Sequence, residues 1–317
     1  MAEPLSSAPT DSTIVIVGAG PVGVYLAVRL AAQGIQTTVL EAASSISDAP
    51  RAVTHMPTMF AEFKKAGIYD MLQAQSKTHS GAVSFRKPSD QSLIERIPPI
   101  PGRPGPIVVP QKQFTETLIQ RLRGLEKGRL CLGTKVTKIE EMEGGESVMV
   151  EAQEYASGET KRFRAQWLIG ADGGKSFVRN AMGIRYEGET LPWKLVAADV
   201  VFPFQDYGFD GANFMCDDED FGNIAVTTEL EDGSWLWRVG CAFPDRMSDE
   251  EIMKALPAKF DKMFPGPKPA DYKLVNAAPY QASQLCVPKF RKGRILLIGD
   301  AAHCKSLLSH LLPHSSV

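Results

Sequence analysis

The chain has 317 residues, of which 44% are hydrophobic and 23% charged, as is ordinary for a globular protein with a sizeable core. Its formal net charge of −2 gives no electrostatic reason to expect nucleic acid or an anionic membrane surface as a partner. The five cysteines are scattered, with no CxxC pair and no histidine at metal-ligand spacing. We therefore expect a reducing, cytoplasmic location, no metal site, and small molecules as partners.

Residues 1–12 are rich in Pro, Ser and Ala and are expected to form a mobile arm. The next segment, residues 13–41, predicts a buried strand, a glycine turn, a helix that Gly34 stops, and a second strand that ends on Glu41. In such a unit the first glycine permits the tight turn, the second lets the backbone approach a pyrophosphate, and the third lets the helix pack on the strand. These glycines are Gly18, Gly20 and Gly23.

Glu41 follows Gly18 by 23 residues, close to the interval at which a carboxylate meets the ribose of an adenine dinucleotide. The unit predicts a dinucleotide site and leaves FAD and NAD open. A structural turn without a ligand is one alternative. A membrane anchor over residues 14–32 is another, but the glycines, Pro21 and Arg29 argue against it, and we expect no membrane span.

Arg51 lies in the polar loop beyond Glu41, where an ordinary surface arginine and a phosphate or ribose contact are equally compatible with the sequence. An amphipathic helix then ends at Gly67, and residues 81–97 contain two short strands. After a proline-rich stretch that reads as a linker, apolar residues at every fourth position predict a helix that begins near Gln111.

Three strands are expected in the middle of the chain, at Lys135–Glu141, Ser147–Tyr155 and Thr160–Trp167, as a small antiparallel layer. The segment 168–179, LIGADGGKSFVR, combines an apolar strand end, Asp172, two glycines and a helix start. Backbone N–H groups and a carboxylate could face a cofactor there. An Asp-Gly turn with a helix cap is the alternative interpretation.

Residues 195–243 predict three further strands of an antiparallel sheet. Trp235, Trp237 and Phe243 in this region are more often core residues than ligand contacts, although an aromatic sheet face also suits an apolar substrate.

Ser248 and Glu251 form a capping box that opens a helix, which Pro257 is expected to divide. After Pro265 we expect loops as far as a buried strand at Arg294–Ile298. A turn at residues 299–302 follows at the carboxyl end of that strand, where open α/β sheets bind ligands.

Taken together, GAGPVG with Glu41, GADGGKSFVR and RILLIGDAAH resemble, in this order and spacing, the flavin-dependent aromatic hydroxylases typified by para-hydroxybenzoate hydroxylase. The resemblance covers residues 13–303. It implies an α/β fold in which a Rossmann-like FAD-binding domain with a parallel sheet is interleaved with an α+β substrate domain built on an antiparallel sheet. The expected FAD-binding domain comprises residues 13–80, 105–185 and 285–303, and the substrate domain comprises residues 81–104 and 186–284.

The resemblance also implies contacts with FAD for residues in each motif. These are Gly18, Gly20 and Gly23 at the pyrophosphate, Glu41 at the adenosine ribose, Arg51 at the cofactor, Gln111 on the flavin side, Asp172 and Gly173 in a motif linked to both FAD and NADPH, and Asp300 at the ribityl chain.

The implied reaction uses NADPH to reduce the flavin and places one oxygen atom from O₂ on a phenolic or other apolar aromatic molecule. The motifs do not separate NADPH from NADH, and no catalytic side chain is assigned. His303, beside Asp300, is interpreted as a support of the turn. Two alternatives stay open: a flavin reductase or dehydrogenase that never inserts oxygen, and a flavin-binding remnant that acts through protein contacts.

The last residues, 304–317, depart from the family pattern. Family members usually continue past GDAAH with a proline, a glycine-rich turn and a long helix that faces the flavin ring, whereas this chain reads CKSLLSHLLPHSSV. From that difference we expect weakened FAD binding, and oxidation of NADPH that releases hydrogen peroxide in place of a hydroxylated product.

Overall fold

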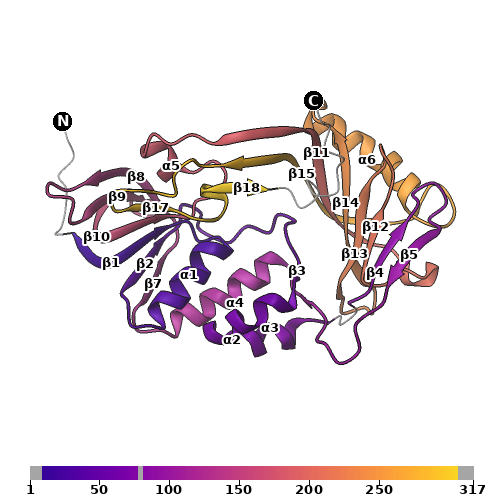
Figure 1. Cartoon of the computed structure of the whole chain (residues 1–317), viewed down its shortest axis with the longest axis horizontal. Helices are drawn as coiled ribbons and strands as arrows, with labels where there is room; N and C mark the ends of the chain where they lie inside the picture. The colour runs from indigo at the N-terminus through magenta and orange to yellow at the C-terminus, as the bar shows by residue number, and fades with distance from the viewer. Residues whose placement is uncertain (1–8, 78–80, 306–317) are drawn as a thin grey trace.

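A computed structural model describes residues 9–77 and 81–305 of the chain, in which two large sheets lie side by side (Figure 1). Five strands of the first sheet are parallel, in the order β17-β10-β1-β2-β7. They are β1 (Thr10–Val17), β2 (Thr37–Leu40), β7 (Gly128–Cys131), β10 (Thr160–Gly170) and β17 (Ile295–Leu297). The short β16 (Arg291–Lys292) pairs antiparallel with β17, and β8 (Thr134–Glu141) and β9 (Val148–Glu154) form an antiparallel layer on β10.

Both faces of this sheet are covered, as the apolar β1 sequence predicts. Ile14 and Ile16 pack into a core with the helices on one face, whereas Val15 and Val17 pack into a second core on the other. The helices are α1 (Pro21–Ala31), α2 (Phe60–Ala66), α3 (Tyr69–Gln75) and α4 (Gln111–Arg123), and the second core includes side chains of β8, β9 and α5 (Phe177–Ala181). The predicted α/β class with a parallel sheet is confirmed.

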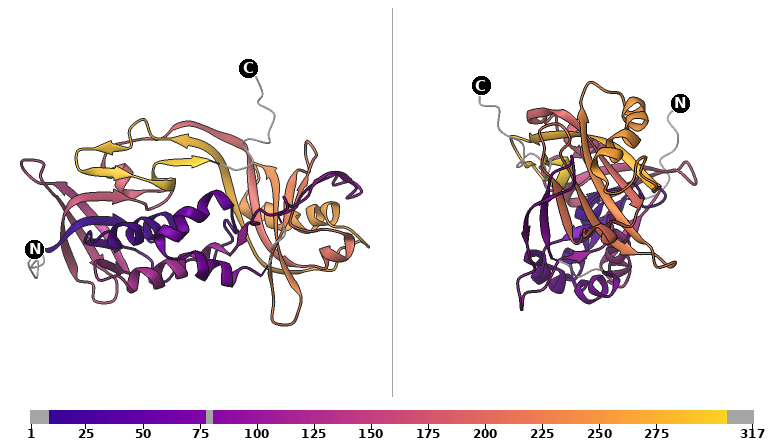
Figure 2. Two further views of the ribbon diagram at one scale, coloured as in Figure 1. Left: turned by 60° about the horizontal axis from the view of Figure 1, so that its bottom comes forward. Right: turned by 90° about the vertical axis from the view of Figure 1, so that its right-hand side faces the viewer.

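The second sheet has the order β18-β15-β11-β14-β13-β12-β4-β5 and is antiparallel except for the pairing of β4 with β12. Its strands are β4 (Val83–Arg86), β5 (Leu93–Ile97), β11 (Glu187–Val201), β12 (Ala212–Met215), β13 (Gly222–Glu229), β14 (Trp235–Pro244), β15 (Lys273–Cys286) and β18 (His303–Lys305). The helix α6 (Asp249–Met263) packs on one face only, which Figure 2 shows from the side. The antiparallel sheet predicted for this part of the chain is confirmed.

The long strands β11 and β15 connect the two sheets (Figure 1). The expectation of loops after Pro265 was wrong, because residues 273–286 form β15 and pair with β11 along nearly its whole length. This strand contains Pro279, which lacks the N–H of an ordinary strand residue. The proline is tolerated because β18 pairs only with Gln284–Cys286 in the described chain, so β15 is an edge strand at the proline and needs no N–H on that side.

The helix α6 is continuous, so the expected division at Pro257 was wrong. The predicted capping box at its start is present, with Ser248 and Glu251 hydrogen-bonded to each other's backbone N–H groups. Ile252, Leu256 and Phe260 are buried on one face of the helix, and this burial offsets the backbone hydrogen bond that a proline removes.

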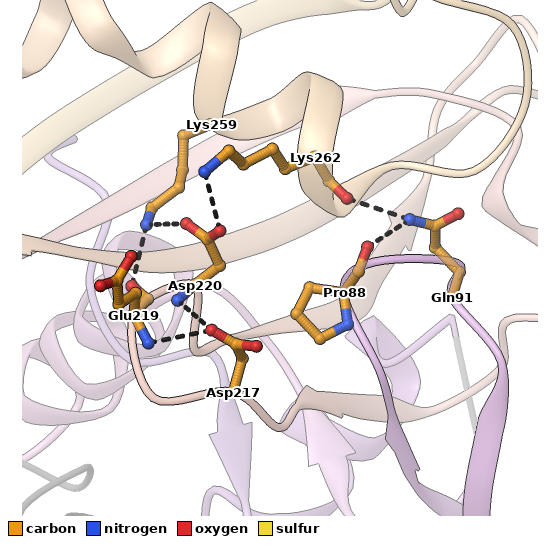
Figure 3. Close-up of polar contacts among 7 residues, drawn as sticks. All are labelled: Pro88, Gln91, Asp217, Glu219, Asp220, Lys259 and Lys262. Carbon is orange, nitrogen blue, oxygen red and sulfur yellow. Dashed lines mark hydrogen bonds and ion pairs between the residues drawn. The ribbon is translucent and has the colours of Figure 1, made fainter.

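Lysines near the C-terminal end of α6 fasten the helix to the loop after β12 (Figure 3). Lys259 Nζ lies 2.6 Å and Lys262 Nζ 2.9 Å from the carboxylate oxygens of Asp220. Gln91, in the β4–β5 turn, donates to the carbonyl oxygen of Lys262 at 3.0 Å. These contacts link α6, the loop after β12 and the β4–β5 hairpin on the same face of the sheet.

Smaller differences concern the ends of elements. Residues 10–12, expected in the mobile arm, extend β1, and the strand expected at Thr160–Trp167 continues to Gly170. The proline-rich linker contains β6 (Ile107–Val108), which pairs with β3 (Thr54–His55). No helix of the described residues is long and apolar enough to cross a membrane. The exact domain boundaries stay a prediction.

Candidate cofactor and substrate site

The three motifs come together at the carboxyl edge of the parallel sheet. Backbone hydrogen bonds link the strand ends in series: Gly18 N to Leu40 O at 2.8 Å, Ala171 N to Val17 O at 2.8 Å, and Ile298 N to Gly170 O at 2.9 Å. The glycine turn, the segment from Ala171 and the turn η3 (Gly299–Ala301) therefore start side by side. This edge is where open α/β sheets bind ligands.

The three glycines of the first turn have different surroundings. Gly18 has φ +106°, and a Cβ there would overlap the Ala171 carbonyl group. A Cβ at Gly23 would overlap the carbonyl oxygen of Gly18, so this glycine lets α1 sit tightly on the turn. Around a Cβ at Gly20 there is open space within 4 Å. The roles expected from the sequence agree with this geometry: a tight turn, close helix packing, and a backbone that a ligand can approach.

Glu41 lies at the end of β2 and reaches back to the glycine turn. Its Oε2 accepts a hydrogen bond from Ala19 N at 2.7 Å, and its Oε1 accepts one from Ala43 N at 2.8 Å. Each carboxylate oxygen has a second lone pair and can accept another donor, such as a ribose hydroxyl. The predicted ribose contact and the observed support of the turn are therefore compatible.

Asp172 caps the helix α5. Its carboxylate accepts hydrogen bonds from the hydroxyl of Ser176 and, at 3.0 Å, from the backbone N–H of Val178. Ser176 in turn accepts from Arg179 N at 2.9 Å. The structure therefore shows the helix cap that was the alternative interpretation of this motif. A cofactor contact of Asp172 stays a prediction. The next residue, Gly173, has φ +79°, and a Cβ placed on it would meet no atom within 4 Å.

Sequence reasoning gave no role to Arg179, the last residue of the second motif. The guanidinium is buried and donates to Gly174 O at 2.8 Å and to Ala301 O at 3.1 Å. It also lies 3.8 Å from the ring centroid of Tyr186. Arg179 therefore joins the second motif to the third. The sequence did carry a signal for this contact, because GADGGKSFVR places Arg179 in the short helix that follows the glycine pair.

The third motif is held from two sides. A Cβ at Gly299 would lie 3.2 Å from Val22 in the first turn of α1, so η3 packs directly against the glycine-turn helix. On the other side, the Tyr186 hydroxyl donates to the carbonyl oxygen of Asp300. Burial, together with the nearby Cys304 thiol, raises the pKa of Tyr186 far above its usual value, so the phenol stays protonated as a donor. The Asp300 side chain is exposed at this edge.

Arg51 lies where the first part of the chain meets the second sheet. Its backbone carbonyl accepts a hydrogen bond from Arg238 on β14, and Arg238 forms a buried ion pair with Asp199 on β11, with Nε and Oδ1 2.7 Å apart. Asn276 on β15 donates to the carbonyl of Asp48 at 3.3 Å. The face of the second sheet opposite α6 is therefore turned toward the loop that carries Arg51.

Gln111 begins α4, and its segment is tied to that of Arg51. The backbone N–H of Val109 donates to Val53 O at 2.8 Å, beside the β3–β6 pair. The structure thus brings the predicted flavin-side glutamine near the same end of the molecule as the Arg51 loop.

His55, which sequence reasoning missed, lies on this β3–β6 pair. Its ring stacks on Phe114 at 4.4 Å between centroids, and its Nε2 is buried without a hydrogen-bond partner in the described structure. Burial lowers the pKa of this imidazole, an effect that the backbone of Val109 partly offsets.

The aromatic residues that the sequence singled out on β14 belong to the core beneath α6. Trp237 and Phe243 are buried in the cluster beneath α6, and Trp235 packs against that cluster. The core interpretation of these residues is confirmed, so the face of the sheet opposite α6 is formed by other side chains.

The arrangement fits FAD. An open backbone at Gly20, a carboxylate at Glu41 and an exposed Asp300 beside the first turn of α1 supply donors and acceptors suited to a pyrophosphate and to sugar hydroxyls. The described residues contain no group of three or more His, Cys, Asp or Glu placed to hold a metal ion.

Comparison with known proteins agrees with this geometry. The model of the FAD binding domain family matches residues 11–308. Para-nitrophenol 4-monooxygenase of Pseudomonas sp. (strain WBC-3) is 31% identical over 94% of this chain and 73% of that protein. The 6-hydroxy-3-succinoylpyridine 3-monooxygenase of Pseudomonas putida (strain DSM 28022 / S16) is 30% identical over 92% of this chain and 72% of that protein.

Among solved structures, p-nitrophenol 4-monooxygenase from Pseudomonas putida DLL-E4 superposes with a TM-score of 0.86 at 30% identity, covering 96% of this chain and 76% of that one. Aklavinone-11 hydroxylase, solved with FAD and aklavinone, shares the fold with a TM-score of 0.80 at 19% identity. The chain belongs to the family of FAD-dependent aromatic monooxygenases.

Proposed function

We propose that the chain binds FAD at the junction of the three motifs and, with NADPH as reductant, places one oxygen atom from O₂ on a phenol. One observation carries this proposal. The glycine turn, the second motif and the GD turn are joined at one sheet edge, and the Arg51 loop at that edge contacts the second sheet through Arg238. A cofactor at the edge would therefore lie beside that sheet.

Bound FAD supplies the redox chemistry. The residues of this chain would bind and orient it: the turn at Gly20 receives the pyrophosphate, Glu41 the adenosine ribose, and Asp300 the ribityl chain. Arg51, Gln111, Asp172 and Gly173 are proposed as further cofactor contacts. The second sheet would cover the reacting region and exclude water. The relatives that act on nitrophenol support a phenolic substrate, and 4-nitrophenol is the first compound to test.

The test supplies FAD-loaded protein with NADPH, 4-nitrophenol and ¹⁸O₂. We expect the phenol to accelerate NADPH oxidation and one labelled atom to appear in the aromatic product, with hydrogen peroxide measured alongside so that coupled and uncoupled turnover are told apart. NADH in place of NADPH tests the choice of reductant. NADPH oxidation that no phenol accelerates, with no label in any aromatic product, would favour a flavin reductase or dehydrogenase.

We also infer a cytoplasmic location. Support comes from the five cysteines, all of which are free thiols, as expected in a reducing compartment.

A further inference from the structure

One row of side chains crosses six strands of the second sheet at a single level. The strand registers align, in order across the sheet, Phe85, Phe214, Asn223, Gly240, Ala197 and Ala278. The neighbours of Gly240 along β14, Val239 and Cys241, are buried in the core beneath α6. Because successive side chains of a strand point to opposite faces, the row lies on the face away from α6.

This face is the one that meets the proposed cofactor region. The next level along the strands holds Asp199 and Arg238, and Arg238 donates to the backbone of Arg51. Tyr280, at the level on the other side of the row, lies close enough to Arg51 and Arg238 for both cations to oppose the rise in its pKa that burial causes. The row is therefore flanked on both sides by groups close to the Arg51 loop.

The row combines a flat floor with one polar group. Ala197 and Ala278 carry only methyl side chains, so a planar ring can approach the backbone of the sheet there, and Gly240 leaves room for the neighbouring amide. The Asn223 amide lies across Gly240, since a Cβ on that glycine would overlap its Oδ1. Beyond the amide, Phe214 and Phe85 stack with centroids 5.7 Å apart. The small residues thus leave room for an aromatic ring, and the Asn223 amide lies between that room and the rings of Phe214 and Phe85.

Among the described residues the Asn223 amide is available to a ligand, whereas Arg238, at the next level of the sheet, is already paired. Within the described part of the chain, Asn223 has no hydrogen-bond partner for its side chain, although both it and Gly240 are partly exposed. The guanidinium of Arg238 donates hydrogen bonds to both carboxylate oxygens of Asp199 and to the Arg51 carbonyl. The Asp199 carboxylate therefore neutralises the charge of Arg238, and the Asn223 amide presents an uncharged donor and acceptor.

We propose that the floor of Ala197 and Ala278 receives the substrate ring and that Asn223, which lies over Gly240, selects its substituent, favouring an uncharged polar group such as nitro or hydroxyl over a carboxylate. A nitro oxygen accepts from the Nδ2 donors, and a hydroxyl donates to Oδ1. This assignment rests on the proposed function and adds the residue that sets its substrate class.

The experiment measures binding directly, by equilibrium dialysis of 4-nitrophenol and of 4-hydroxybenzoate against the FAD-loaded chain. The variants are Asn223→Ala, Asn223→Asp and Gly240→Ala, whose new Cβ displaces the amide. Gln205→Ala, which removes an exposed amide elsewhere on the second sheet's domain, is the matched control. FAD affinity and melting temperature are measured for each protein to show that it is folded and loaded.

We expect 4-nitrophenol to bind at least about tenfold more tightly than 4-hydroxybenzoate, and Asn223→Ala and Gly240→Ala to weaken nitrophenol binding about tenfold. Asn223→Asp should lose 4-nitrophenol but retain hydroquinone, which can donate to the carboxylate. The control should bind like the unaltered chain.

The experiment distinguishes a wrong role for Asn223 from a wrong proposed function. If the unaltered chain binds 4-nitrophenol and the Asn223 variants bind it within twofold of the same affinity, the role of Asn223 is overturned while the proposed function stands. Tighter binding of 4-hydroxybenzoate than of 4-nitrophenol would also overturn it. If the FAD-loaded unaltered chain binds no phenol, the proposed function fails and this assignment falls with it.

Discussion

The carboxylate of Glu41 accepts a hydrogen bond of 2.7 Å from the backbone N–H of Ala19, so the end of β2 is fastened to the middle of the glycine turn. The residue expected at the adenosine ribose therefore also shapes the loop expected at the pyrophosphate. Cofactor affinity should depend on both effects, because a loosened turn presents its N–H groups to the phosphates less well.

We predict that Glu41→Gln lowers FAD affinity about tenfold or more without unfolding the chain. Hydrogen bonds to charged groups contribute about 1.5–3 kcal/mol each, and a neutral amide with one oxygen cannot replace both carboxylate contacts. Fluorescence titration with FAD measures the loss, and circular dichroism confirms the fold. An unchanged dissociation constant would remove Glu41 from the site.

Arg179→Lys should weaken the connection between the second and third motifs. A lysine keeps the charge but cannot span the carbonyls of Gly174 and Ala301 as the planar guanidinium does. We expect a lower melting temperature, and weaker FAD binding even at temperatures where the variant is folded. Arg185→Lys, a nearby arginine change outside these contacts, serves as control. If both variants melt and bind FAD like the unaltered chain, Arg179 does not position the motifs.

His55 should make the protein sensitive to mild acid. Its folded pKa lies below the ordinary value near 6.5 because the buried ring is held neutral. The unfolded chain therefore binds the proton more readily, and stability that is fully present above about pH 6.5 is lost as the pH falls toward the folded pKa. Urea unfolding at pH 7 and pH 5 measures this loss, and His55→Leu should reduce it. An equal loss in both proteins would assign the sensitivity to other groups.

Asp220→Asn should destabilise the anchoring of α6 (Figure 3). Burial alone would raise the pKa of the Asp220 carboxyl, but hydrogen bonds from Lys259 and Lys262 outweigh it and hold the pKa below its usual value. This stabilisation is present above about pH 4 and is lost as the pH falls through the folded pKa. We expect the substitution to cost about 1–3 kcal/mol of unfolding free energy at pH 7. The exposed Asp218→Asn is the control, and equal stability of the two variants would contradict the role of Asp220.

Local signals made the first half of the site predictable. The strand, the glycines, Pro21 and Glu41 lie within one stretch of chain, so spacing alone predicts the turn and helix, and the structure agrees. The capping box at Ser248 was predictable for the same reason. In contrast, β15 contains a proline and small residues, and it is a strand because of its pairing with a partner more than 80 residues away in sequence (Ala197 with Ala278, for example).

The contacts that assemble the site depend on such distant pairings. Arg179 reaches Ala301, and Arg238 reaches Arg51, only after the parallel strands and the second sheet are in place. The level that aligns Asn223 with Gly240 depends on the register of the β13–β14 pair, which shifts between Val226 and Thr228, and the alternation of residues did not indicate that shift. Sequence reasoning therefore identified the motifs and missed the side chains that join them. The expectation drawn from residues 304–317, weaker FAD binding with release of peroxide, stays a prediction, because the structure describes only Cys304 and Lys305 of that segment.

The measurement that tests the central claim most directly is FAD titration of Gly20→Val beside the unaltered chain. A Cβ at Gly20 has open space within 4 Å, so the variant should fold normally, while its side chain would fill the space that the pyrophosphate needs. We predict saturable binding of FAD by the unaltered chain, and no detectable binding by a Gly20→Val protein that has the same melting temperature in the absence of FAD. A Gly20→Val protein that binds FAD with unaltered affinity would contradict a cofactor site at the junction of the three motifs.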